Sequence, residues 1–292
     1  MKIDQHVDAF SACRPRLLGI AYGMLGELGE AEDIVQDAWL RWDAADRSEI
    51  RNIEAFLVTI TTRLAVDRLR SAQRRRETYV GPWLPEPLVT DADGSPDDPE
   101  RIAIEAERLS LALLGALERL NPVERAVLIL RDSFDIDYAE IADVVDRSPA
   151  NVRQIAVRAR AHAGDESRTR PVLAEEQERL ATAFMAATLA GDIDAIRSAL
   201  AADAILYSDG GSVVLAARKP IYGADKIARF LVGVQRKPAF VHDTEYAVVR
   251  VNGDFGVRMV SPTAGFVGIV AIQVQDGEIV AVRIFFNPER FG

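Results

Sequence analysis

The spacing of apolar residues changes once along this chain, and the change separates two kinds of structure. Up to about residue 165, apolar residues recur every three or four positions, which is typical of amphipathic helices. After a polar break at 165–171, runs of alternating apolar residues appear between helical segments. The sequence therefore predicts an all-helical part followed by an α+β domain.

The helical part is itself divided by a stretch rich in proline and acidic residues. Residues 1–80 and 102–165 carry helical patterns, whereas 81–101 contain five prolines, and five acidic residues lie between Asp91 and Glu100. Such a composition predicts an extended, solvated linker. We therefore expect two helical modules, a linker at 81–101, and a C-terminal domain at 172–292.

The segment 138–160 has the pattern of a helix-turn-helix. Ser148 is a good N-cap, and Pro149 fits the first helical turn, where its missing N–H costs nothing. Asn121 and Pro122 give the same signal for the start of the helix that leads to this segment. The second helix carries polar side chains opposite its apolar face, of the kind that contact base edges or phosphates in a major groove. The alternative is an ordinary helical hairpin with a solvated arginine face. The polar side chains are Asn151, Arg153, Gln154, Arg158 and Arg160.

The C-terminal domain should combine helices with a curved antiparallel sheet. Helices are predicted at 175–190, closed by Gly191, and at 193–200 and 223–234. Asn252-Gly253 and Asp276-Gly277 separate strand-like runs, and such pairs are strong hairpin signals. The predicted strands are 204–207, 213–216, 244–251, 255–260, 266–275 and 278–286.

Charge and composition exclude several classes of protein. The net charge of −10 argues against a protein that coats nucleic acid without selectivity, although arginines cluster locally at 63–76 and 147–170. The N-terminus lacks the pattern of a signal peptide, and no apolar run is long enough to span a bilayer. Cys13 is the one cysteine, which suits a reducing compartment, so we expect a cytoplasmic protein. The histidines of the chain show no metal-ligand spacing, and we expect neither a metal nor a cofactor.

Three segments, in order, resemble one family. Residues 30–42 (EAEDIVQDAWLRW) look like region 2.2 of a bacterial sigma factor, and 55–70 (AFLVTITTRLAVDRLR) look like regions 2.3 to 2.4. Residues 117–125 (LERLNPVER), followed by the helix-turn-helix, look like region 4. The chain resembles the small extracytoplasmic-function sigma factors over about residues 6–165.

This resemblance implies a promoter-specificity subunit that binds core RNA polymerase and promoter DNA and is not an enzyme. The helix-turn-helix would contact the −35 element. At region 2.2, the residues implied to bind polymerase are Asp33, Gln36, Asp37 and Arg41. At the −10 element, the implied DNA-binding residues are Thr59, Thr62, Arg63, Arg68, Arg70, Arg74, Arg75 and Arg76. Many relatives outside this subgroup carry asparagine where Arg63 stands.

Residues 83–87 (WLPEP), 209–211 (DGG) and 287–290 (NPER) resemble the corresponding segments of one subgroup of this family. The C-terminal extension of that subgroup is SnoaL-like, with the cone fold of ketosteroid isomerases. In that subgroup the extension tunes activity from within the chain, so no separate anti-sigma factor is expected. The glycine motif at 209–213 lacks the usual third glycine and the basic residue after it. The residues implied in this regulatory contact are Trp83, Leu84, Pro85, Glu86, Pro87, Asp209, Gly210, Gly211, Asn287 and Pro288.

Two alternatives stay open from the sequence. The C-terminal domain could bind a small ligand or act as an enzyme, because cone folds often enclose an apolar pocket. The chain could also be a helix-turn-helix repressor with a ligand domain, although that leaves the region 2-like segment unexplained. The groups available for ligand binding or catalysis are Tyr207, Asp209, Tyr222, His242, Asp243 and Tyr246.

Overall fold

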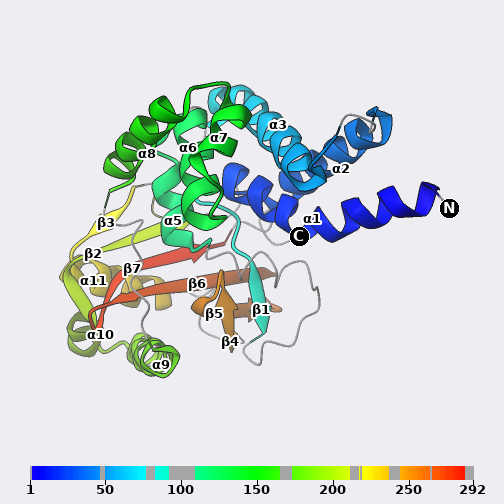
Figure 1. Ribbon diagram of the computed structural model, residues 1–292. Helices are drawn as coiled ribbons and strands as arrows, with labels where there is room; N and C mark the ends of the chain where they lie inside the picture. The colour runs from blue at the N-terminus through cyan, green and yellow to red at the C-terminus, as the bar shows by residue number, and fades with distance from the viewer. Residues whose placement is uncertain are drawn as a thin grey trace. The chain divides into compact units, whose positions relative to one another are not determined.

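The chain folds into two compact units (Figure 1). The computed structural model describes residues 2–46, 50–76, 83–91, 109–164, 173–210, 217, 219–236, 244–263 and 265–286. Unit 1 comprises Met1–Thr78 and Asp98–Arg168, and unit 2 comprises Tyr79–Asp97 and Thr169–Gly292. The two predicted helical modules therefore lie in one unit, and most of the predicted linker belongs with the C-terminal domain.

The N-terminal module of unit 1 contains the helices α1 (Lys2–Leu25), α2 (Leu28–Ala44) and α3 (Ile53–Arg76). Each packs against the other two. Trp42 is buried among them and donates its indole N–H to the backbone oxygen of His6 at 3.1 Å. The apolar stripes predicted for this module therefore form a shared helical core, as their spacing requires.

The second module carries the predicted helix-turn-helix. Its elements are α5 (Leu111–Leu117), α6 (Pro122–Leu128), η2 (Ile129–Ser133), α7 (Tyr138–Val145) and α8 (Pro149–Ala163). The turn between α7 and α8 uses Asp146 in the left-handed conformation, at φ 55°.

The helix starts of this module follow the capping signals of the sequence. The Asn121 side chain accepts hydrogen bonds from the N–H groups of Val123 and Glu124. In turn, the Glu124 carboxylate accepts a hydrogen bond from the N–H of Asn121. The hydroxyl oxygen of Ser148 accepts from the N–H of Asn151 at 3.3 Å. Both predicted N-caps are therefore confirmed.

The two modules of unit 1 meet through a buried arginine. Arg125 is 2% exposed, and its Nε and Nη2 donate to the backbone oxygen of Gly23 at 3.2 and 3.1 Å. Its Nη1 pairs with Glu118. A Cβ at Gly23 would lie 2.7 Å from Cδ1 of Ile129, so the absence of a side chain lets η2 approach α1 closely.

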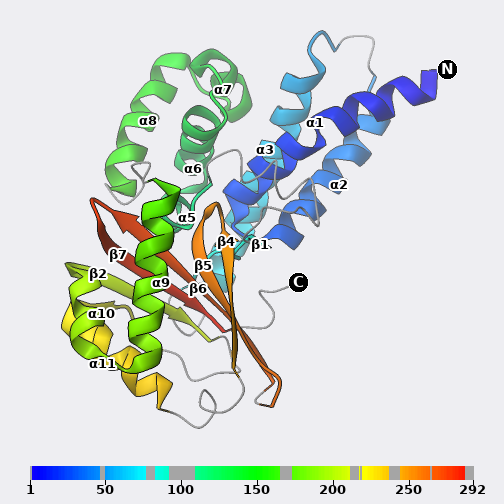
Figure 2. The ribbon, with the colours of Figure 1, turned by 90° about the horizontal axis from the view of Figure 1, so that it is seen from below.

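In the described residues, unit 2 contains a seven-stranded sheet and three helices, which lie on one face of the sheet (Figure 2). The strand order is β1-β4-β5-β6-β7-β2-β3. The helices are α9 (Ala174–Ala190), α10 (Ile193–Ala199) and α11 (Ala224–Gln235). The strands are β1 (Val89–Asp91), β2 (Leu200–Asp209), β3 (Ile221–Tyr222), β4 (Glu245–Val251), β5 (Asp254–Ser261), β6 (Phe266–Gln275) and β7 (Glu278–Phe285).

The sheet is mixed, which corrects the expected antiparallel sheet. β2 pairs with β7 in parallel, whereas the other pairings of the sheet are antiparallel. Asn252 and Asp276 both adopt φ 51° in the predicted hairpins, followed by glycines at φ above 80°. Local turn residues therefore predicted the hairpins, but they carry no information on how the distant strand β2 pairs with β7. The predicted strand 213–216 lies outside the described residues.

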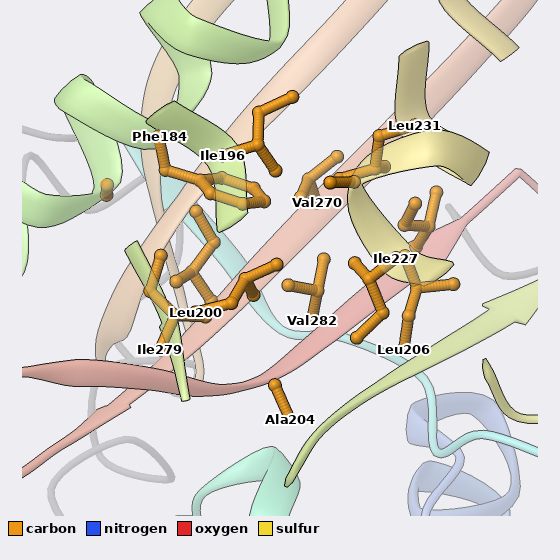
Figure 3. Close-up of a cluster of buried hydrophobic side chains, with 14 of the residues drawn as sticks. Phe184, Ile196, Leu200, Ala204, Leu206, Ile227, Leu231, Val270, Ile279 and Val282 are labelled. Carbon is orange, nitrogen blue, oxygen red and sulfur yellow. The ribbon is translucent and has the colours of Figure 1, made fainter. Parts of the chain in front are cut away.

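Apolar side chains fill the space between the helices and the sheet of unit 2 (Figure 3). Phe184 from α9 and Ile227 from α11 lie against Leu206, Val270 and Val282 of the sheet. These residues are all at most 5% exposed.

Part of the predicted linker is a strand of this sheet, so the expectation of a solvated linker is wrong for residues 83–91. β1 pairs with β4, with Val89 opposite Val251. The N–H of Leu88 donates to Oδ1 of Asn252 at 3.0 Å, and the N–H of Asn252 donates to the oxygen of Leu88 at 2.8 Å. Leu84 and Leu88 are buried. The prolines suggested that this segment is solvated. Burial of Leu84 and Leu88 and pairing of β1 with the edge of β4 instead place it in the sheet of unit 2.

Candidate nucleic-acid interface

One face of α8 is open to solvent along its whole length. Its exposed residues recur at three- and four-residue steps, which places them on a single helix face. The opposite face is buried against the rest of the module through Val152, Ile155, Ala156, Ala159 and Ala163. The exposed face includes Ala150, Arg153, Gln154, Val157, Arg158, Ala161 and His162.

Two arginines of α8 are held by neighbouring side chains. The Arg153 guanidinium lies 5.7 Å from the ring centre of Tyr138, and Arg131 lies 5.2 Å from the same ring. Arg160 pairs with both carboxylate oxygens of Asp132, and this hydrogen bonding raises the pKa of the guanidinium. Of the predicted −35 contacts, Arg153, Gln154 and Arg158 are therefore exposed. Arg160 is already ion-paired, and Asn151 is half-buried in the first turn of α8.

Arg63 of α3 contacts the helix-turn-helix. Its Nε donates to the backbone oxygen of Val144 at 3.0 Å, and its Nη2 donates to that of Asp143 at 2.8 Å. These acceptors are in the last turn of α7, where helix carbonyls lack intrahelical partners. A residue predicted to contact the −10 element thus spans the two modules within unit 1.

The other predicted −10 residues whose side chains are described are either buried or bonded to neighbouring groups. Thr59 donates its hydroxyl to the oxygen of Ala55 at 2.7 Å, and Thr62 is fully buried, so this structure does not place Thr62 where DNA could reach it. Arg68 lies 3.7 Å from Glu30, and Arg70 lies 3.1 Å from Asp67. The side chains of Arg74, Arg75 and Arg76 lie outside the described residues.

A pocket of about 540 Å³ lies beside Arg63, within unit 1. Phe56, Thr59 and Arg63 of α3 line it on one side, and Glu140 and Asp143 of α7 line it on another. Its walls therefore come from both helical modules, and its lining carries charges of both signs.

The predicted polymerase-binding residues share the solvent-facing side of α2. Asp33, Gln36, Asp37 and Arg41 are all exposed. Leu40, which was not among the predicted residues, lies on the same side and is 58% exposed. The buried side of the helix consists of Leu28, Ala31, Ile34, Val35, Ala38 and Trp42.

The predicted regulatory residues of unit 2 are only partly described. Trp83 is half-buried, as is Glu86, whereas Leu84, Pro85 and Pro87 are buried. Asp209 is 2% exposed and Gly210 is buried. The N–H of Phe286 donates to the oxygen of Asp209 at 2.8 Å, so the end of β2 lies beside the end of β7. Gly211, Asn287 and Pro288 lie outside the described residues.

Of the polar groups considered for catalysis that the structure describes, Tyr207, Asp209 and Tyr222 lie outside the apolar interior of unit 2. Tyr207 and Asp209 alternate with Leu206 along β2, which places them on the sheet face opposite the apolar cluster. Tyr222 is 59% exposed, and Tyr246 packs against the apolar cluster. His242 and Asp243 lie outside the described residues.

A buried polar group lies beside β2. Arg283 is 6% exposed, lies 5.6 Å from the ring centre of Tyr207, and donates to Oε1 of Gln273 at 3.0 Å. Burial raises the pKa of Asp254 to about 6, although Arg283 opposes that shift. Arg283 and Gln273 therefore satisfy each other within the sheet, whereas Asp254 accepts a hydrogen bond from Nε2 of Gln177 on α9 at 3.4 Å.

Comparison with known proteins assigns the family. The Sigma-70 region 2 family matches residues 9–75, and the Sigma-70, region 4 family matches residues 110–162. The chain is 38% identical to the ECF RNA polymerase sigma factor SigJ of Mycobacterium tuberculosis, over 98% of this chain and 93% of that protein. This chain belongs to the ECF RNA polymerase sigma factors.

Other comparisons also cover nearly the whole length of this ECF sigma factor. The probable ECF RNA polymerase sigma factor SigI of Mycobacterium tuberculosis is 31% identical over 96% of this chain and 92% of that protein. The crystal structure of Mycobacterium tuberculosis SigJ aligns with a TM-score of 0.78 and 35% identity, over 98% of both chains. The predicted architecture, two helical sigma modules with a C-terminal SnoaL-like α+β domain, is thereby confirmed.

None of the helices in the described parts of the chain is long and apolar enough to cross a membrane. The expectation that the protein lacks a separate anti-sigma factor finds no support among these relatives and stays a prediction.

Sequence reasoning missed two residues of the α8 surface. Val157 is 66% exposed among the predicted DNA contacts, and Tyr138 holds Arg153. Counting three- and four-residue steps from Arg153 and Gln154 would have placed Val157 on the same face. The stack of Tyr138 on Arg153 joins two helices, so no local pattern could have found it.

Proposed function

We propose that this ECF sigma factor binds core RNA polymerase through α2 and promoter DNA through α3 and α8, and so directs transcription initiation in the cytoplasm. The observation that carries the proposal is the exposed face of α8, where Arg153, Gln154 and Arg158 protrude from a capped helix of a helix-turn-helix. Arginine carries paired donors that bind O6 and N7 of guanine in a major groove, and the amide of glutamine carries a donor and an acceptor that match adenine.

The α2 face supports the polymerase part of the proposal. Asp33, Asp37 and Leu40 form an exposed acidic and apolar surface on a helix whose other side is buried. An apolar side chain among charged residues can anchor a protein interface, while the acidic residues favour a basic partner. The pocket beside Arg63 lies on α3, where the −10 strand is expected to bind.

Run-off transcription with purified core polymerase tests the function. The full chain should start RNA at defined promoters from a genomic fragment library, and mapping of the 5′ ends should give the −10 and −35 elements. Replacing both Arg153 and Arg158 by alanine should lower specific transcripts at least tenfold, since each base contact contributes about 1–3 kcal/mol.

The matched control is Arg197→Ala, which removes an exposed arginine of α10 that pairs with Asp194. It should leave transcription unchanged. A chain that never starts RNA with core polymerase, but binds DNA as a dimer, would instead be a helix-turn-helix repressor, and the proposal would be abandoned.

We further propose that the C-terminal domain tunes the sigma modules by holding the segment between them. Residues 83–91 are packed into unit 2 through Leu84, Leu88 and the hydrogen bonds to Asn252. A segment held in a sheet cannot serve as a free tether, so its docking restricts the separations available to the two modules. This proposal supports regulation within one chain and requires no enzymatic activity.

Asn252→Gly tests this regulatory role. Glycine removes the side-chain acceptor for the Leu88 N–H but tolerates the φ of 51° at that position. Asp276→Gly is the matched control, because Asp276 also adopts φ 51° in a hairpin. Asn252→Gly and Trp83→Ala should change promoter output severalfold, whereas Asp276→Gly should not. Equal output from all three variants would contradict linker docking as a control of activity.

Absence of catalysis by the C-terminal domain is also part of the proposal. The buried side chains between its helices and sheet support it, since they are apolar and supply no acid or base for proton transfer. A ligand for this domain would be found by thermal-shift screening of the full chain, and a saturable rise in melting temperature would argue for a ligand-sensing role.

A further inference from the structure

Val157 is an apolar side chain in the middle of the exposed face of α8. It is 66% exposed, and it recurs with Arg153 and Gln154 at four- and three-residue steps on the open face of α8. Arg158 follows it directly and is exposed as well. A valine here gains no burial energy, and its branched side chain is a weaker helix former than alanine. Neither packing nor helix stability explains this residue.

The chemistry of a major groove does explain it. Each A·T pair presents the C5 methyl of thymine there, and apolar side chains contact that methyl. Arginine and glutamine instead bind the edges of guanine and adenine. One turn of helix separates Gln154 from Val157, about 5 Å along the axis, so neighbouring base pairs fall within reach of both.

The surroundings of α8 hold this surface in place. Ser148 caps the start of the helix, Tyr138 lies under Arg153, and Asp132 binds Arg160 near the end. A valine in a helix adopts one χ1 rotamer in about 90% of cases. The two methyl groups of Val157 are therefore presented in a nearly fixed position, which suits recognition of a single methyl group.

We propose that Val157 is a specificity-determining residue that contacts the C5 methyl of a thymine in the −35 element. The inference rests on the proposed function, because it requires α8 to enter the major groove of that element. It adds an apolar contact to the polar contacts of Arg153, Gln154 and Arg158, and it predicts an A·T pair next to the bases that those residues bind.

Deoxyuridine substitution tests the contact directly, because uracil differs from thymine only by the missing methyl. The holoenzyme, made from the full chain and core polymerase, is titrated with a fluorescent duplex that carries the mapped promoter. Each thymine of the −35 element, on either strand, is replaced in turn. One replacement should weaken binding by the wild-type holoenzyme about fourfold, as expected for one buried methyl.

Val157→Ala should weaken binding to the thymine duplex by a similar factor and should no longer respond to that deoxyuridine. Leu189→Ala is the matched control, because Leu189 is an exposed apolar residue on α9 of unit 2. It should keep the full wild-type response.

The outcomes separate the inference from the proposed function. Specific binding with no deoxyuridine effect, or with the same effect in Val157→Ala, would overturn the thymine contact alone. A holoenzyme that shows no preference for the mapped promoter over scrambled duplex would contradict the proposed function, and the contact with it.

Discussion

Two helices of this sigma factor are expected to contact promoter DNA, and the structure treats them differently. On α8, Arg153, Gln154 and Arg158 extend into solvent. On α3, Arg63 is bonded to two backbone oxygens of α7, and Thr62 is buried. The helix that would bind the −35 element exposes the side chains predicted to contact DNA. In the helix that would bind the −10 element, Arg63 is instead hydrogen-bonded to another part of the protein.

The difference has a simple electrostatic origin. The last carbonyls of a helix lack intrahelical partners and carry partial negative charge, so they attract cations. Arg63 satisfies this need for α7, Arg16 donates to the oxygen of Phe134 at 2.8 Å, and Arg125 donates to that of Gly23. The two sigma modules are therefore joined by arginines bound to backbone oxygens. We expect these contacts to compete with the binding of α3 to DNA.

The largest effect should come from Arg125, which is buried between the modules. Arg125→Ala would leave the Glu118 carboxylate and the Gly23 oxygen without this donor, and should lower the free energy of unfolding by about 3–5 kcal/mol. Urea denaturation followed by circular dichroism measures the loss. Arg147→Ala, an exposed control, should cost less than about 0.5 kcal/mol. Equal stability of the two variants would show that contact between the modules contributes little.

Replacing Arg16 should have a smaller effect on stability, and it should change stability and transcription in opposite directions. Arg16→Gln removes one hydrogen bond to Phe134 and an ion pair with Glu54, and should lower stability by about 1 kcal/mol. If the modules must separate for α3 to bind DNA, the same change should raise the initial rate of run-off transcription severalfold. The exposed pair of Arg229 with Asp225 provides the control variant Arg229→Gln. A transcription rate that falls together with stability would remove competition as an explanation for the difference between α3 and α8.

The smallest effect concerns the support beneath Arg153. Tyr138→Leu keeps an apolar side chain but removes the ring that contacts Arg153, and should weaken promoter binding about threefold. Fluorescence anisotropy with the promoter duplex measures the change. Tyr222→Leu, at an exposed tyrosine of unit 2, should have no effect. Unchanged binding by Tyr138→Leu would mean that the α8 surface does not depend on α7 for its order.

The signals that predicted this protein well were local ones. The caps at Asn121 and Ser148, the hairpin pairs at Asn252 and Asp276, and the helix end at Gly191 each depend on a few neighbouring residues. The exposed face of α8 followed from its helical period for the same reason. Predictions failed where partners come from afar: residues 83–91 were expected in solvent, and they pack into unit 2.

By itself, the sequence determined the kinds of element, their ends, the helix-turn-helix and the family of the chain. These depend on residue spacing, on the backbone preferences of single residues and on short motifs, all of which lie between residues that are close in the sequence. Tertiary structure alone decided that β2 runs parallel to β7, that β1 joins the sheet, and that Arg63 binds the end of α7. Each of these joins residues that are distant in sequence, and such pairings are chosen by burial and by the need of unpaired backbone groups for hydrogen bonds.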